Sequence, residues 1–155
     1  MTSLAPFESA KLIRFHHCDP AGIVFYPQYF VLMNELVEDW FNDGLGVDFA
    51  RFHAEGRHGI PMAHLECDFL APSTVGETLR FGLSVQKIGA SSLTLAVEAR
   101  AGDEVRVRAT LVVVQASLDT RRAVPFSTEF GRSSRGSFAS GDASAPSPWI
   151  DEENA

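Results

Sequence analysis

The chain has few of the residues that would support disulfide or nucleic-acid chemistry. Its only two cysteines, Cys18 and Cys67, show no C-x-x-C spacing, which excludes a disulfide framework and indicates a reducing compartment. The formal net charge is −7, and no basic run is longer than Arg121-Arg122. A phosphate backbone needs a basic stripe or patch, so we expect no nucleic-acid partner.

Long hydrophobic runs are also missing. The longest stretch without a charged residue, 20–34, is shorter than the roughly 20 apolar residues that a membrane-spanning helix needs. No basic segment followed by an apolar one marks a signal peptide at the start of the chain. We therefore expect a cytoplasmic protein with no membrane partner.

What the chain does have is apolar surface for a core. Of its 155 residues, 45% are hydrophobic and 12 are Phe, which is enough for one domain with an aromatic-rich interior or pocket. From residue 131 the composition changes to Ser, Gly, Ala and Pro and ends in acidic residues. This change predicts a domain over 1–130 followed by a mobile tail over 131–155.

Hydrophobic periodicity predicts one long helix and several strands. Residues 7–17 alternate like a strand, 27–43 have a wide apolar stripe at helical spacing, and 47–58 read as a short helix or loop. Four further stretches have strand character: 62–70, 78–87, 93–100 and 105–118. Short turns separate them, so the order predicts an α+β domain in which one antiparallel sheet of about five strands wraps around one central helix.

One turn places a carboxylate just before that helix. Asp19 is followed by Pro20 and Gly22, which stop a strand and permit a tight turn, and Pro27 suits the first turn of a helix. The first N–H groups of a helix have no internal acceptor and carry partial positive charge. Asp19 reads either as an ordinary turn residue or as a catalytic acid facing an electrophilic carbonyl.

The run over residues 17–30, HCDPAGIVFYPQYF, resembles the active-site signature of the hotdog-fold acyl-CoA thioesterases, most closely the 4-hydroxybenzoyl-CoA thioesterase branch. The resemblance implies a hotdog fold and a homodimer or homotetramer with active sites between subunits. It implies that Asp19 attacks the thioester carbonyl or activates water, while the backbone N–H of Tyr26 binds the oxyanion. Phe25, Pro27 and Tyr29 would shape the mouth of the pocket, with an acyl-CoA as substrate and no cofactor.

Three departures from that branch bear on the substrate. Asn34 replaces an acid that meets the substrate phenol, so another aryl-CoA or a short or medium acyl-CoA stays open. His17 stands where many members carry an acid, and could tune the pKa of Asp19. The turn holding Lys87 and Ser91 has one Lys in place of a basic cluster, although its backbone and hydroxyl donors could bind phosphate. Alternative basic groups are Arg106, Arg108, Arg121 and Arg122, whose alternation also fits a solvated strand face.

Other readings of the same residues stay open. His16, His17 and Cys18 offer metal-ligand types, but neighbouring strand residues point to opposite faces, so we expect no metal. Cys18 could be a nucleophile, although a structural thiol fits better, and His64 is a weak candidate near a partner's acyl pocket. As a whole the chain could instead be a non-catalytic acyl-CoA-binding or regulatory module. It could also be a thioesterase for acyl groups on a carrier protein, which the negative charge disfavours.

Overall fold

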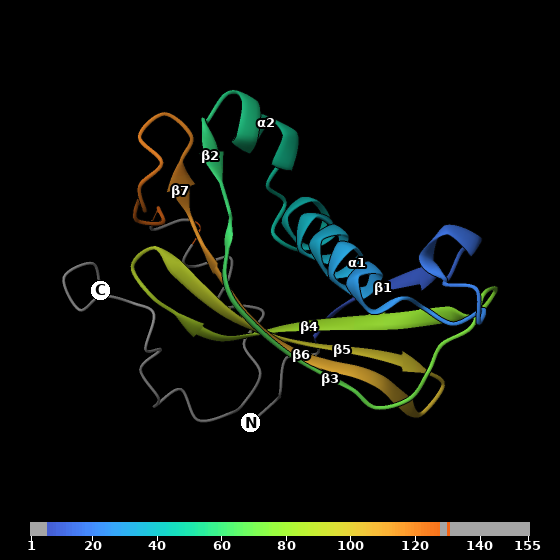
Figure 1. The fold of residues 1–155 in the computed structure, drawn as a ribbon. Helices are drawn as coiled ribbons and strands as arrows, with labels where there is room; N and C mark the ends of the chain where they lie inside the picture. The colour runs from blue at the N-terminus through green and yellow to red at the C-terminus, as the bar shows by residue number, and fades with distance from the viewer. Residues whose placement is uncertain (1–5, 128–129, 131–155) are drawn as a thin grey trace.

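A five-stranded antiparallel sheet forms the body of the protein, with strand order β1-β4-β5-β6-β3 (Figure 1). The structure is a computed structural model and describes residues 6–127 and Phe130. The strands are β1 (Phe7–Leu12), β3 (Met62–Phe69), β4 (Thr78–Ile88), β5 (Ser92–Ala101) and β6 (Glu104–Val114). Strands lie at all four predicted positions from 62 onward, with short turns between them, but β6 is shorter than the predicted 105–118. The predicted tail over 131–155 lies outside the described residues.

Helix α1 (Tyr26–Asp39) lies against one face of the curved sheet and supplies one half of the core (Figure 1). Its buried residues are Tyr29, Leu32, Met33, Leu36 and Val37. The inward-facing residues of the strands form the other half of the core. Examples on β4 are Leu79, Phe81 and Leu83, which are fully buried. The sheet buries one face of this helix, and the apolar residues at helical spacing in the sequence supply that face. This arrangement confirms the α+β hotdog prediction.

The long helix ends differently from the prediction of 27–43. The α-helical part stops at Asp39, and Trp40–Gly44 continue as one π-helical turn. The backbone N–H of Leu45 donates to the carbonyl of Trp40 at 2.8 Å, and Gly46 has a φ of 68°, which is open to glycine without strain. The wider turn accommodates Trp40 and Phe41, which are both fully buried.

The predicted strand over 7–17 is wrong in its second half. β1 ends at Leu12, and Phe15–His17 form a 3₁₀ turn. The N–H of His17 donates to the carbonyl of Arg14, and the Arg14 N–H donates to Nδ1 of the His17 ring at 2.9 Å. The His17 side chain thus takes the hydrogen bond of a backbone N–H that would otherwise pair with a neighbouring strand. Alternation along the sequence does not reveal such a side-chain contact.

The remaining elements are short. Helix α2 (Phe49–Ala54) is followed by β2 (His58–Gly59), which pairs with β7 (Ala116–Ser117) in a separate two-stranded ladder. The predicted strand 105–118 is interrupted at Gln115, whose N–H donates to the carbonyl of Ser91 at 2.7 Å. In the part of the chain that the structure describes, no helix is long and apolar enough to cross a membrane.

Candidate active site

Asp19 lies in a tight hairpin between the 3₁₀ turn and α1. The Phe25 N–H donates to the His17 carbonyl at 3.0 Å, and the Asp19 N–H donates to the Ile23 carbonyl at 3.0 Å. The turn itself closes through Gly22, whose φ of 77° favours glycine. This closure brings Asp19 and the start of α1 together, since Asp19 follows His17 by only two residues, roughly 7 Å along an extended chain.

The Asp19 carboxylate is only partly engaged. Oδ1 accepts a hydrogen bond from the Ala21 N–H at 2.9 Å, an Asx turn that fixes the side chain. Among the residues that the structure describes, none donates to Oδ2. Asp19 is half-buried, so one carboxylate oxygen holds the turn while the other keeps its capacity to accept a proton or to attack a carbonyl.

The backbone N–H of Tyr26 is the first of α1 and has no acceptor within the helix. The N-cap residue is Phe25, whose side chain makes no capping hydrogen bond, and the next position is Pro27, which has no N–H. The helix start therefore presents one donor, with the partial positive charge of the helix N-terminus behind it. A developing oxyanion is a suitable acceptor there.

An apolar groove of about 280 Å³ runs beside this helix start. It is lined by Ile23, Val24, Tyr26, Tyr29 and residues 69–72. The ring of Phe69 meets the ring of Tyr26 edge-on at 6.1 Å, and both side chains are about half exposed. Phe25 is exposed to a similar degree, whereas Tyr29 is 3% exposed. Exposed aromatic rings at such a groove can stack on a flat acyl group.

Asn34 and His64 lie away from this groove. Asn34 is exposed on α1 two turns beyond Tyr26, beside a second groove of about 450 Å³ that also contacts Ile60 and Met62. Leu65 and Cys67 of β3 pack on the core, so alternation directs His64 to the opposite face of the sheet. There its Nε2 is 3.1 Å from the Glu66 carboxylate.

Lys87 and Ser91 lie at the opposite end of the sheet from Asp19. β4 starts beside the Asp19 hairpin and runs 11 residues to Ile88, so about 30 Å of strand separates Lys87 from that start. The Ser91 side chain is 9% exposed, and its carbonyl accepts from Gln115. One chain therefore does not bring these two residues to the same site as Asp19.

The two cysteines have no catalytic geometry. Cys18 Sγ lies 3.6 Å from the Arg14 carbonyl, and burial, aided by Asp68, raises the pKa of the Cys67 thiol to about 11. A thiol with such a pKa is a poor nucleophile at neutral pH. Within residues 6–127 and Phe130, no group of three or more His, Cys, Asp or Glu side chains is arranged to hold a metal ion.

His17 is held neutral by its surroundings. Its side chain is 5% exposed, Nδ1 accepts from the Arg14 N–H, and its pKa is lowered by burial first and then by His16 and Arg14, against an opposing effect of Glu35. A protonated ring would lose the acceptor at Nδ1. His17 thus supports the 3₁₀ turn that leads into the Asp19 hairpin.

We expect the thermal stability of the protein to fall as the pH drops below about 6.5, the ordinary histidine pKa. The folded-state pKa lies below the unfolded value, so the unfolded chain binds more protons in that window and acid favours unfolding. Thermal denaturation between pH 7.5 and 5 measures this slope. In His17→Asn the amide oxygen can still accept from Arg14 without titrating, so the slope should flatten; an unchanged slope would contradict the assignment to His17.

One group of residues was missed by sequence reasoning. Arg106 of β6 binds the 72–77 loop through Glu77 and Ser73. Its guanidinium, one of the alternative candidates for binding phosphate, is therefore engaged by groups of the protein itself. Its alternation with Val105 and Val107 matches a solvated strand face, and no local signal shows that a loop folds over it. Ser73 was visible only as a turn residue.

Comparison with known proteins identifies the family of this chain. The sequence model of the Thioesterase-like superfamily matches residues 13–133. A 1,4-dihydroxy-2-naphthoyl-CoA hydrolase of Nostoc punctiforme is 26% identical over 121 residues, covering 77% of this chain and 81% of the relative. The enzyme of the same name from Acaryochloris marina is 30% identical over a shorter span, 50% of this chain and 56% of the relative.

Solved structures show the same fold. A 1,4-dihydroxy-2-naphthoyl-CoA thioesterase from Synechocystis has a TM-score of 0.75 and 21% identity, over 83% of this chain and 95% of that one. A gentisyl-coenzyme A thioesterase has a TM-score of 0.76 and 21% identity, over 83% and 99%. With a family match over most of its length and the Asp19 hairpin within it, the chain belongs to the Thioesterase-like superfamily of hotdog proteins.

Proposed function

We propose that this protein hydrolyses an aryl-CoA thioester to the free acid and CoA. The observation that carries the proposal is the hairpin that brings the half-free Asp19 carboxylate to the start of α1, where the Tyr26 N–H has no helical acceptor. Family membership supports the reaction class, and the similar hydrolases named for naphthoyl and gentisyl thioesters support an aromatic acyl group. Exposed Tyr26 and Phe69 beside the apolar groove offer such a group a surface.

In the proposed reaction, Oδ2 of Asp19 attacks the thioester carbonyl while the Tyr26 N–H binds the developing oxyanion. The C–S bond breaks, CoA leaves as the thiolate and takes a proton from water, and hydroxide or water opens the resulting anhydride to release the acid and restore Asp19. In the alternative path, Asp19 removes a proton from a water that attacks the carbonyl directly, the C–S bond breaks, and the departing CoA thiolate takes that proton from Asp19. Both paths balance with water alone and need no metal or organic cofactor.

We also infer that two copies complete the site. β3 is an edge strand whose ladder partner is β6, and its other side is open for pairing with a second β3. Two-fold antiparallel pairing would set Met62 of one copy near Phe69 of the other. The second copy would then bring the groove of Asn34, and the end of the sheet with Lys87 and Ser91, toward the Asp19 hairpin. This pairing gives a homodimer, and we propose a homodimer or homotetramer located in the cytoplasm.

A panel of CoA thioesters tests the function. We expect thiol release from benzoyl-CoA and 1,4-dihydroxy-2-naphthoyl-CoA with a kcat/KM at least about tenfold above that for hexanoyl-CoA, since an aryl ring fills the groove better. Because Asn34 carries no charge for a phenol, 4-hydroxybenzoyl-CoA should have no large advantage over benzoyl-CoA. Thiol release is followed with a thiol-reactive dye, and binding by calorimetry.

Three results would contradict this proposal, the last of them only in its choice of acyl group. Tight binding of the whole panel without thiol release would make the chain a non-catalytic acyl-CoA-binding module. Release from acyl carrier protein thioesters alone would instead place the substrate on a protein. A preference for hexanoyl-CoA over every aryl thioester would contradict the aromatic assignment while leaving the reaction class intact.

A further inference from the structure

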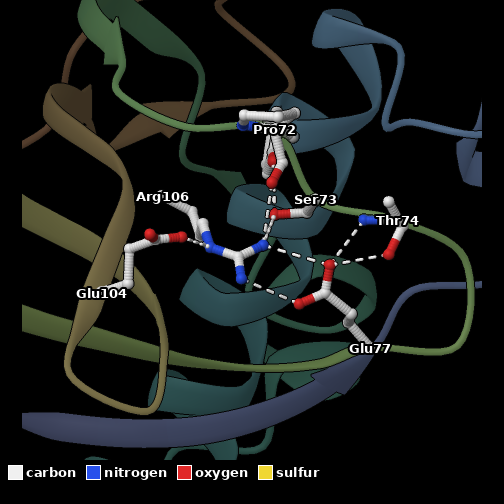
Figure 2. Close-up of polar contacts among 7 residues, drawn as sticks. Pro72, Ser73, Thr74, Glu77, Glu104 and Arg106 are labelled. Atoms are coloured by element: carbon white, nitrogen blue, oxygen red, sulfur yellow. Dashed lines mark hydrogen bonds and ion pairs between the residues drawn. The ribbon is translucent and has the colours of Figure 1, made fainter.

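Arg106 of β6 directs its guanidinium inward to the 72–77 loop, as Figure 2 shows. Only 12% of its side chain is exposed. Nη1 donates to the Pro72 carbonyl at 2.8 Å and to Ser73 Oγ at 3.2 Å, and Nη2 donates to Glu77 Oε2 at 2.9 Å. Glu104 forms an ion pair with Nε from the same strand. Both terminal nitrogens of this guanidinium thus donate to the 72–77 loop.

Glu77, at the end of the 72–77 loop, binds both Arg106 and the start of the same loop. Its Oε1 accepts from the Thr74 N–H and hydroxyl, both at 2.8 Å, and from Arg106 Nη1 at 3.1 Å. These hydrogen bonds, with Arg106 first, lower the pKa of Glu77 to about 2. The carboxylate therefore stays charged throughout the neutral range and keeps its ion pair with Arg106 there.

Ser73 joins this loop to the central helix. It is fully buried, and its Oγ accepts from the Tyr29 hydroxyl at 3.0 Å as well as from Arg106. Tyr29 belongs to the first turn of α1, only three residues after the Tyr26 donor. A buried hydroxyl with two directed donors fixes the loop relative to the helix start.

The same loop carries the Asp19 hairpin. The Ser73 carbonyl accepts from the Val24 N–H at 2.9 Å, and the Val75 N–H donates to the Gly22 carbonyl at 3.3 Å. Ile23 and Thr74 form an isolated antiparallel bridge between these contacts. The second half of the hairpin, residues 22–24, therefore packs on the 72–77 loop, and Asp19 lies on the first half across from it.

We propose that Arg106, Glu77 and Ser73 form a clamp that positions Asp19 relative to the Tyr26 N–H. These are positioning residues: their side chains bind the loop and α1, and act on the reaction through the hairpin. A displacement of about 1 Å at a reacting group can cost about 100-fold in rate, so a buried clamp at this place affects turnover. This inference rests on the proposed hydrolase function and names residues that its mechanism does not otherwise require.

Kinetics of mild variants test the clamp. We expect Ser73→Ala to lower kcat about tenfold with KM changed less than twofold, because the loop loses two hydrogen bonds while the Ser73 carbonyl keeps Val24. Tyr29→Phe should have a smaller effect of the same kind. That effect should vanish in the Ser73→Ala background, since the Tyr29 hydroxyl donates to Ser73. Arg106→Met should have the largest effect of the three single variants.

Arg100→Met is the matched control. Arg100 lies on β5 and pairs with Glu98 at 2.6 Å, with 38% of its side chain exposed, and it touches no part of the hairpin. Loss of this ion pair should leave kcat unchanged. If Ser73→Ala and Arg106→Met lower the melting temperature but change kcat no more than Arg100→Met does, the residues are structural and the clamp is refuted. Additive effects of Tyr29→Phe and Ser73→Ala would also refute it.

An Asp19→Asn arm separates this proposal from the proposed function. If Asp19→Asn removes turnover while the clamp variants keep it, the clamp fails and the function stands. If Asp19→Asn keeps wild-type turnover, the proposed catalytic role of Asp19 fails, and the clamp, which acts through it, fails as well. Ser73→Ala and Tyr29→Phe are conservative changes, so the test remains decisive even where Arg106→Met does not fold.

Discussion

Asp19→Asn should lower kcat about 1000-fold or more on an aryl-CoA substrate while the protein still folds and binds the thioester. Loss of a nucleophile or general base has effects of this order, because an amide neither attacks a carbonyl nor accepts a proton from water. The substitution keeps the shape of the side chain, and its Oδ1 can still accept from the Ala21 N–H at the 2.9 Å distance seen for Asp19. Thiol release gives kcat, and calorimetry gives the dissociation constant.

The control is Asp103→Asn. Asp103 lies exposed in the turn between β5 and β6, so the same chemical change should leave kcat and binding unaltered. Wild-type turnover in Asp19→Asn would contradict both proposed paths. Where turnover is lost, hydroxylamine added to a single turnover of the wild-type enzyme distinguishes them: capture of an acyl group from the protein indicates an anhydride on Asp19, and its absence favours general-base catalysis.

Strands and the central helix could be predicted from the sequence where the hydrophobic pattern is consistent with only one type of element. The alternation of Leu79 and Phe81 with Arg80 and Gly82 reflects a sheet with one buried face, and β4 has that face. The apolar stripe after Pro27 reflects a helix with one face buried against a sheet. Both patterns are local, and burial by other elements reinforces them.

The sequence could not show features that depend on distant neighbours. The His17 ring binds the Arg14 backbone, so an apparent strand ends early in a 3₁₀ turn. Arg106 alternates like a solvated residue, but a loop more than 25 residues earlier in the chain covers it, since Pro72 and Ser73 lie 34 and 33 residues away. Alternation reports which face a side chain takes and does not report what covers that face.

For the candidate site the same limit has a functional consequence. The motif identified Asp19 and the Tyr26 N–H because both lie within one short hairpin. Lys87 and Ser91 were grouped with them through family resemblance, and one chain holds them at the far end of the sheet. Whether they meet the substrate depends on how a second copy pairs, which is why the open edge of β3 matters to the proposed function.

Phe41→Ala should reduce the free energy of unfolding by roughly 3–5 kcal/mol, the usual cost of truncating a buried Phe. Phe41 is fully buried in the π-helical turn, and its ring packs on four others at centroid distances of 5.4–5.6 Å: Trp40, Phe49, Phe52 and Phe130. This cluster joins the end of the central helix to α2, so truncation leaves a cavity between two elements. Domains are stable by only about 5–15 kcal/mol, so the loss is a large share of the total.

Phe15→Ala is the matched control for this change, because Phe15 has the same side chain but is 87% exposed in the 3₁₀ turn. Its truncation should alter the free energy of unfolding by no more than about 0.5 kcal/mol. Denaturant unfolding monitored by far-UV circular dichroism measures both variants. Equal, small losses would contradict a core function for the aromatic cluster. A large loss in Phe41→Ala alone, with kcat retained below the melting temperature, would show that the cluster stabilises the helix end without taking part in the chemistry at its start.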